Sequence, residues 1–439
     1  MNFRVLSRLF FFLLVELLLC GGAPRARTAE APSGSKDAQL RFVVILARHG
    51  VRSPTGKVAQ YGQYSAAPWP AWDVPPGYLT PHGYELMKLF GAYDRSKLAG
   101  QGLLASSGCG DAAHVTILAD SDQRTRETGN ALAEGMLPGC TIDVRALPEG
   151  TDDPLFHFRG AHAEAPLATA AIAGRIGGDA SNLTEAYRLQ LSALDRVLAG
   201  CGKLQAAGDK RTSLFDIPAS LAPGKGDHSV ELRGPLATAS TLSENLLLEY
   251  TQGMSAENTG WGCLDGATLR NILQLHAAES EIAQRTPILA RSTASNLLDH
   301  ILKALEQSAT GKPVAGAPGT PGDKLLILVG HDTNIATVAG ALGIDWIIDG
   351  RRDDTPPGGA LFFELWRSQS DASEFVRVRY TAQTLEQMRE AQPLTAQNPP
   401  ADAPVFLPAC SREDLSCTWA SFDAAVRADI DPAYVSAQP

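Results

Sequence analysis

The sequence lacks the short motifs that mark several large enzyme classes. No GxSxG, Walker A, GxGxxG or HExxH pattern occurs, so serine-hydrolase, nucleotide-binding and zinc-protease functions have no support. No CxxC pair occurs either, which argues against a structural zinc site. The chain also has no internal repeat, so a solenoid or propeller architecture is not expected.

The chain has no excess of positive charge. Its net charge is −10, which argues against broad binding to nucleic acid or to an acidic membrane surface. Any positive pocket must therefore be local. Hydrophobic residues make up 44% of the chain, enough for the core of one large domain or two smaller ones.

No apolar run is long enough to span a membrane. The longest covers residues 9–19, follows Arg4 and Arg8, and precedes small residues from Gly21 onward. This pattern is typical of a signal peptide within residues 1–30, although a buried helix is the alternative. The cleavage point stays open, and a leucine before Cys20 is a poor fit to a lipoprotein site. We expect a periplasmic or secreted protein without a stable membrane anchor.

Seven cysteines are present, and six remain once the signal peptide is removed. An even number in an exported chain favours disulfides. Cys410 and Cys417 could close a small loop, and Cys109 and Cys140 could staple a strand-helix unit. If both of these bonds form, Cys201 and Cys263 are the two cysteines that remain, and we expect them to pair.

Aliphatic runs predict an α/β fold with a central, mostly parallel mixed sheet flanked by helices. Strands are expected at residues 40–47, 115–119, 142–147 and 324–329, with two antiparallel ones at 361–366 and 375–380. Thr80 and Pro81 read as the N-cap and first residue of a helix. Loops rich in Gly and Pro are expected at 308–323 and 392–404.

Strand signals nearly vanish between residues 163 and 291. Leu242, Leu246 and Tyr250 recur there at helical spacing. We therefore expect a signal peptide over 1–30, an α/β domain built from 36–160 plus 290–439, and a mainly α-helical inserted domain over 161–289.

Three expected strands end in polar clusters. Arg48, His49 and Arg52 follow the first strand, and His331 and Asp332 follow the one at 324–329. A third cluster follows the strand at 115–119 and contains Asp120, Asp122 and Arg124. Since the carboxyl ends of strands in an open α/β sheet face the ligand crevice, these clusters can converge.

Three arginines and two histidines suit a dianion, most simply phosphate. Neutral His49 can attack phosphorus and form a phosphohistidine, provided that a backbone carbonyl fixes its tautomer. The arginines and His331 would hold the phosphate oxygens, and Asp332 would protonate the leaving alkoxide. No metal or other cofactor is needed, because the arginines supply the charge.

Each assignment has a competing structural interpretation. Asp332 could be only a helix N-cap, and Arg124 could be only an ion-pair partner of Asp120 or Asp122. For Asp120 two roles stay open: it could line the pocket, or it could orient an arginine. The other histidines have no ligand spacing and are interpreted as surface or satisfied side chains.

The segment "RHGVRSPT" resembles the RHGxRxP signature of the histidine acid phosphatases, and "GHDTNI" is similar to their partner HD motif. Further blocks resemble the bacterial phytase branch, among them "WPAWDVPPGYLTPHGYEL", "ADSDQRTRETG" and "QRTPILARS". The resemblance covers about residues 40–419. It implies a two-lobed phosphomonoesterase with His49 as nucleophile, Asp332 as acid, and Arg48, Arg52, Arg124 and His331 as phosphate ligands.

The same resemblance places Thr55, Glu244 and Thr333 in the substrate pocket. Phytases of this branch usually carry lysine directly after the motif threonine, whereas here Gly56 intervenes and Lys57 follows. Gly50 and Thr333 resemble phytases more than the related glucose-1-phosphatases. For Glu244, a polar residue on a helix is the competing interpretation.

We therefore expect a monomeric phosphatase acting on a small phosphorylated substrate, most simply phytate. A glucose-1-phosphatase or broad sugar-phosphate phosphatase is the enzymatic alternative. A phosphate-ester binding protein without turnover is the remote one, and the presence of both His49 and Asp332 argues against it.

Overall fold

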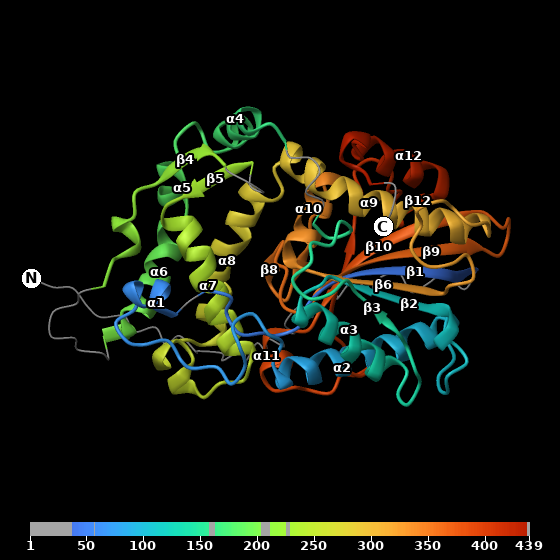
Figure 1. The fold of residues 1–439 in the computed structure, drawn as a ribbon, viewed down its shortest axis with the longest axis horizontal. Coiled ribbons are helices and arrows are strands. Elements are labelled where there is room, and N and C mark those ends of the chain that lie inside the picture. Colours follow the sequence, from blue (N-terminus) through green and yellow to red (C-terminus); the bar gives the residue numbers. More distant parts are fainter. Residues whose placement is uncertain (1–36, 57, 158–162, 203–210, 225–228, 437–439) are drawn as a thin grey trace, which may run out of the picture. The chain divides into compact units, whose positions relative to one another are not determined.

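The expected strands form the centre of one mixed sheet with the order β11-β10-β9-β1-β6-β2-β3 (Figure 1). The computed structural model describes residues 37–56, 58–157, 163–202, 211–224 and 229–436. The parallel strands are β1 (Ala38–Arg48), β6 (Leu325–Gly330), β2 (Val115–Ala119) and β3 (Val144–Arg145). The antiparallel strands are β9 (Ala360–Ser368), β10 (Glu374–Ala382), β11 (Ala401–Val405) and β12 (Ser416–Thr418). The α/β class with a mixed sheet flanked by helices is confirmed.

Two groups of helices cover the sheet on opposite sides (Figure 1). One face carries α2 (Pro81–Gly100) and α3 (Gln123–Met136). The other carries α9 (Pro287–Thr310), α10 (Asp332–Leu342) and α12 (Trp419–Asp429). Thr80 caps α2 as expected, because its side chain accepts a hydrogen bond from the Gly83 N–H.

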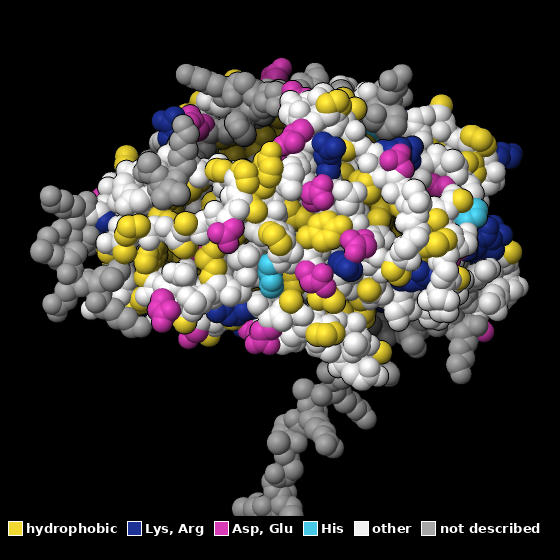
Figure 2. Space-filling view, turned by 60° about the horizontal axis from the view of Figure 1, so that its bottom comes forward, with side chains coloured by type: hydrophobic (Ala, Val, Ile, Leu, Met, Phe, Trp, Pro, Cys, Tyr) yellow, Lys and Arg dark blue, Asp and Glu magenta, His cyan; other side chains and the backbone are white. Residues whose placement is uncertain are grey.

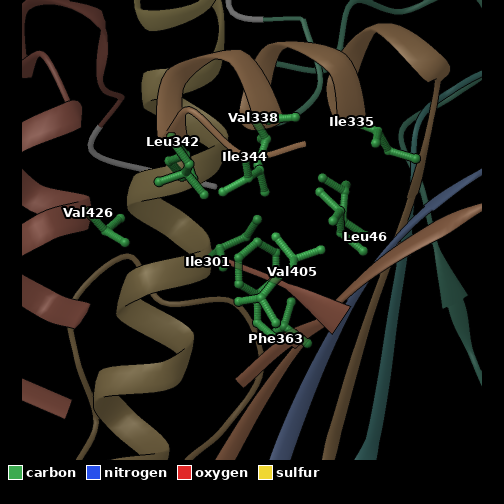
Figure 3. Close-up of a cluster of buried hydrophobic side chains, with 14 of the residues drawn as sticks. Leu46, Ile301, Ile335, Val338, Leu342, Ile344, Phe363, Val405 and Val426 are labelled. Atoms are coloured by element: carbon green, nitrogen blue, oxygen red, sulfur yellow. The ribbon is translucent and has the colours of Figure 1, made fainter. Parts of the chain in front are cut away.

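One buried cluster packs strands β1 and β9 against helices α9 and α10. Figure 3 shows Leu46 from β1, Ile301 from α9 and Ile335 from α10 directed into one cluster with Phe363 of β9. All four side chains are at most 1% exposed. Burial of a side chain of this size contributes roughly 2 kcal/mol, so this cluster holds the sheet firmly against α10.

The segment with few strand signals is mainly helical. It contains α4 (Ala165–Arg175), α5 (Ser181–Ala186), α6 (Arg188–Leu198), α7 (Pro235–Thr251) and α8 (Gly266–Ala283). It also contains the hairpin of β4 (Ser220–Pro223) and β5 (Val230–Arg233), which the sequence did not predict. The described residues form one compact unit, so the expected division into two domains stays a prediction.

Several boundaries differ from those expected. The strand expected at 142–147 has only the two residues of β3, and the loop expected at 392–404 ends where β11 begins. The loop expected from 308 begins later, because α9 continues to Thr310. The smaller elements are α1 (Val58–Tyr61), α11 (Leu385–Arg389), β7 (Ile347–Ile348) and β8 (Arg351–Arg352).

Two of the three expected disulfides are present. Cys109 is bonded to Cys140, and Cys410 to Cys417. The expected bond between Cys201 and Cys263 is absent from the described residues, which is a correction. Cys201 and Cys263 lie in two turns that contact each other, but the Cys263 thiol is directed at the Trp261 carbonyl oxygen, 3.8 Å away.

The expected signal peptide lies outside the described residues. Among the described helices, none combines the length and the apolar character needed to cross a lipid bilayer.

Candidate active site

The three polar clusters converge at one edge of the sheet. β6 lies between β1 and β2 and is parallel to both, so their carboxyl ends coincide. Arg48 is in register with Gly330, and the His49 N–H donates to the Gly330 carbonyl at 3.0 Å. The Asp120 N–H donates to the Val329 carbonyl at 2.9 Å. Residues far apart in sequence therefore meet where the strands end.

His49 is buried with one ring nitrogen committed to the backbone. Its Nδ1–H donates to the Gly50 carbonyl oxygen at 2.9 Å, which leaves the lone pair on Nε2. Burial, and then Arg52 and Arg48, hold the pKa of His49 well below its usual value. The imidazole is therefore neutral in mild acid, with an unprotonated nitrogen near the arginines.

Arg48 and Arg52 share the carboxylate of Glu244 on α7. The Nη2 of Arg48 donates to Oε1 of Glu244, and Nη2 of Arg52 lies 3.8 Å from the same oxygen. Arg48 is fully buried and also donates from Nη1 to the Thr355 carbonyl at 2.5 Å. Burial lowers the pKa of Arg52 to about 10, against the opposing effect of Glu244. Both guanidinium groups are thus fixed and charged at acidic and neutral pH.

Arg124 enters the site from the first turn of α3. Its Nη2 lies 2.6 Å from Oδ2 of Asp122 and 3.5 Å from Nδ1 of His331. Its Nη1 lies 3.5 Å from the Gly77 carbonyl oxygen. The ion pair foreseen as the alternative is thus formed with Asp122, while the same guanidinium group faces His331.

His331 is oriented by Asp120. Its Nε2 lies 2.6 Å from Oδ2 of Asp120, and the same oxygen lies 2.8 Å from Nε2 of His157. Burial would raise the pKa of Asp120, but the hydrogen bonds from His157 and His331 outweigh it and hold the pKa well below its usual value. Asp120 therefore orients a histidine, a role that the sequence analysis did not consider.

Asp332 is the first residue of α10. Its Oδ1 accepts a hydrogen bond from the Thr333 N–H at 2.9 Å, and its Oδ2 lies 3.2 Å from Nη2 of Arg48. Burial raises the pKa of Asp332, but Arg48 and His276 outweigh it and hold the pKa well below its usual value. The carboxyl group is therefore ionised before an anion enters the site.

His276 is a site residue that sequence reasoning missed. From α8, its Nε2 lies 3.8 Å from Oδ2 of Asp332 and 4.0 Å from Oε2 of Glu244, while Nδ1 pairs with the Ser240 hydroxyl at 3.0 Å. A signal existed: His276 follows the buried Leu269 by seven residues, so the two share the inward face of α8. The sequence alone predicts only a surface or satisfied side chain at this position.

The expected outer-pocket residues are only partly described. The Thr55 methyl group and Arg124 both border Gly77, which has the positive φ of 81°. Thr333 directly follows Asp332 in α10. Glu244 faces the arginines rather than solvent. Lys57 lies outside the described residues, so its place in the pocket stays a prediction.

Taken together, the site offers one neutral nucleophile within a cationic cradle. The Nε of Arg52 lies 3.4 Å from Nε2 of His49, and the ring centres of His49 and His331 are 5.6 Å apart. The guanidinium groups beside His49 can bind the oxygens of a tetrahedral dianion while Nε2 of His49 faces its central atom. The arrangement suits phosphoryl transfer to histidine.

Comparison with known proteins agrees with this geometry. The family model of the histidine phosphatase superfamily (branch 2) matches residues 39–171 and 240–381. Phytase AppA of Escherichia coli (strain K12) is 37% identical over 396 residues, covering 88% of this chain and 90% of that protein. Glucose-1-phosphatase of Providencia rettgeri is 28% identical over 414 residues, covering 91% and 94%. The solved structure of Hafnia alvei phytase with myo-inositol hexakis sulphate has a TM-score of 0.81 and 33% identity, covering 91% and 99%.

Proposed function

Because the chain belongs to the histidine phosphatase superfamily (branch 2), we propose that this phosphomonoester hydrolase acts on phytate through a phosphohistidine at His49. The observation that carries the proposal is the bond from His49 Nδ1–H to the Gly50 carbonyl oxygen. That bond keeps the Nε2 lone pair available beside Arg48 and Arg52, where a phosphate group would bind.

In the first step, Nε2 of His49 attacks phosphorus while the ester oxygen leaves. Arg48, Arg52 and Arg124 hold the oxygens of the transferring group and stabilise its charge in the transition state. In the second step, water attacks the phosphohistidine, releases inorganic phosphate and restores the neutral imidazole. A bound phosphate dianion favours the protonated form of His331, whose Nε2–H stays on Asp120 and whose Nδ1–H can then donate to the phosphate group.

Asp332 protonates the leaving alkoxide. Its carboxyl group is ionised in the free enzyme because Arg48 and His276 lie close to it. A bound phosphate dianion neutralises the arginines and adds negative charge, and both effects raise the pKa of Asp332. The acid therefore takes up its proton together with the substrate, which accounts for activity in acid.

Of the two candidate substrates we favour phytate, because the sequence identity to a phytase, 37%, is higher than the 28% identity to a glucose-1-phosphatase. Gly50 and Thr333 point the same way. The second candidate is glucose-1-phosphate or a range of sugar phosphates, which the similarity to a glucose-1-phosphatase over 91% of the chain supports.

We also propose that the protein works outside the cytoplasm as a monomer. The two disulfides support export, since such bonds persist in oxidising compartments. A periplasmic location, removal of residues 1–30 and the absence of a stable membrane anchor or of nucleic-acid partners belong to this proposal.

The test of the substrate is a comparison of kcat/KM for phytate, glucose-1-phosphate and p-nitrophenyl phosphate. The assays use mildly acidic buffer with a metal chelator. We expect turnover of all three and the highest kcat/KM for phytate. A higher value for glucose-1-phosphate would replace phytate as the substrate, and no turnover of any ester would overturn the enzymatic proposal.

A further inference from the structure

The network behind His331 has the composition of a metal site. Among the residues that the structure describes, Asp120, His157 and His331 place one carboxylate oxygen and two imidazole nitrogens within 4.8 Å of one another. Oδ2 of Asp120 lies 2.8 Å from Nε2 of His157 and 2.6 Å from Nε2 of His331. Two histidines and one carboxylate are ligands that zinc and neighbouring transition metals favour.

We propose that Asp120, His157 and His331 bind a first-row transition-metal dication such as Zn²⁺. Zinc binds such nitrogen and oxygen atoms at about 2.0–2.2 Å, so neighbouring ligand atoms around the ion lie roughly 3 Å apart. Binding the ion would lengthen the two separations from Oδ2 of Asp120 by about half an ångström, and the two imidazole nitrogens, which lie within 4.8 Å of each other, would take up the same spacing. The ion replaces the two Nε2–H protons that now point at Asp120.

The surroundings leave a path for the ion and orient the ligand atoms. The side chain of His157 is 42% exposed, whereas Asp120 and His331 are buried, so the ion can arrive from solvent on the His157 side. The Ser121 N–H donates to Oδ1 of Asp120 at 2.7 Å, which leaves Oδ2 for the metal. Asp122 Oδ2 lies 3.5 Å from Nε2 of His331 and is near enough to add a fourth ligand after leaving Arg124.

The ion is not required for turnover but acts on the anion site. It neutralises Asp120 and adds positive charge at the Nε2 side of His331, whose Nδ1 faces Arg124. Added positive charge beside a phosphate site strengthens binding of phosphate. This consequence rests on the proposed function, whereas the binding of the metal does not.

The direct test is calorimetric titration of the chelator-treated full chain with Zn²⁺ at about neutral pH, with Co²⁺ absorbance as a probe of nitrogen ligands. The variant is His157→Asn, because asparagine can still donate to Asp120 but supplies no imidazole. The control is His114→Asn, since His114 precedes β2 whereas Asp120 follows it. We expect stoichiometric uptake by the wild type and the control, and an affinity lower by on the order of 100-fold in His157→Asn.

Equal Zn²⁺ affinity in the wild type and His157→Asn, or no stoichiometric uptake by the wild type, would overturn the site. A second readout is the inhibition constant of inorganic phosphate in the p-nitrophenyl phosphate assay, which we expect Zn²⁺ to lower severalfold in the wild type. Uptake without that change would overturn the link to the anion site. Lack of turnover in the metal-free wild type would instead contradict the proposed function. The titration would still measure Zn²⁺ binding, because it requires no turnover.

Discussion

At the scale of single residues, the hydrogen-bond partner of each imidazole determines what its other nitrogen can do. Nδ1–H of His49 donates a hydrogen bond to the Gly50 carbonyl oxygen, so Nε2 can act as a nucleophile. Nε2 of His331 is used by Asp120, so Nδ1 faces Arg124 and the expected phosphate position. Two histidines in one site therefore differ in role because of the atoms beside them.

The role of Asp332 leads to a prediction about leaving groups. Asp332→Asn cannot donate a proton, so hydrolysis of phytate and glucose-1-phosphate should slow by about 100-fold or more. Hydrolysis of p-nitrophenyl phosphate should slow far less, because p-nitrophenolate leaves without prior protonation. The measurement is kcat for the three esters in both proteins. Equal losses on all of them would argue against Asp332 as the general acid.

Sequence reasoning identified the residues within the two motifs and overlooked those that reach the site from elsewhere. Arg48, His49 and Asp332 follow strands whose ends could be placed from aliphatic runs. His276 arrives on α8 from a segment without motif spacing, and only tertiary packing brings it within 3.8 Å of Asp332. The hydrogen bond from His157 to Asp120 was likewise invisible, since neither the loop path nor the ring direction follows from composition.

At the scale of elements, long apolar runs were predicted well and short strands were not. β6 and the second half of β1 are buried on both faces, which produces continuous aliphatic segments, whereas β2 alternates buried and partly buried residues. β11 contains Pro404 and lies at the edge of the sheet, where a missing N–H is tolerated, so its sequence resembles a loop. The four-residue strands of the β4–β5 hairpin are too short for an alternating pattern to stand out.

Helix α7 carries a buried carboxyl group away from the site. Glu249 is 1% exposed, and its Oε2 accepts a hydrogen bond from the Gly260 N–H at 3.0 Å. Burial raises the pKa of Glu249 from 4.5 to about 8. Between these values the folded protein holds a proton that the unfolded chain has lost, so stability falls as pH rises through this window.

Replacing Glu249 with glutamine should remove that dependence, because the amide is neutral at every pH. Relative to the wild type, Glu249→Gln should gain up to about 4 kcal/mol between about pH 4.5 and 7.5. Urea unfolding at both pH values measures this, with the exposed Glu257→Gln as the control. If the free energies of unfolding of wild type and variant differ by the same amount at both pH values, then the fold does not hold Glu249 protonated.

At the scale of the whole molecule, an acidic protein maintains a local cationic site. The net charge is −10, and acidic and basic side chains are scattered over the face drawn in Figure 2. The positive charge of Arg48, Arg52 and Arg124 is instead concentrated where the parallel strands end. Glu244 and Asp332 balance it until an anion enters. Composition could exclude a broad polyanion partner, but only the parallel order of β1, β6 and β2 explains how the cluster forms.

The central claim is a covalent bond between phosphorus and Nε2 of His49. The most direct measurement is rapid mixing with p-nitrophenyl phosphate, quenching in denaturant at alkaline pH, where phosphohistidine survives, and mass spectrometry of the intact chain and its peptides. We predict that a fraction of the wild type gains one phosphoryl group on the peptide containing His49. His49→Ala should show none and no turnover. A wild type that turns over substrate without phosphorylation of His49, or that carries it on another residue, would contradict the account.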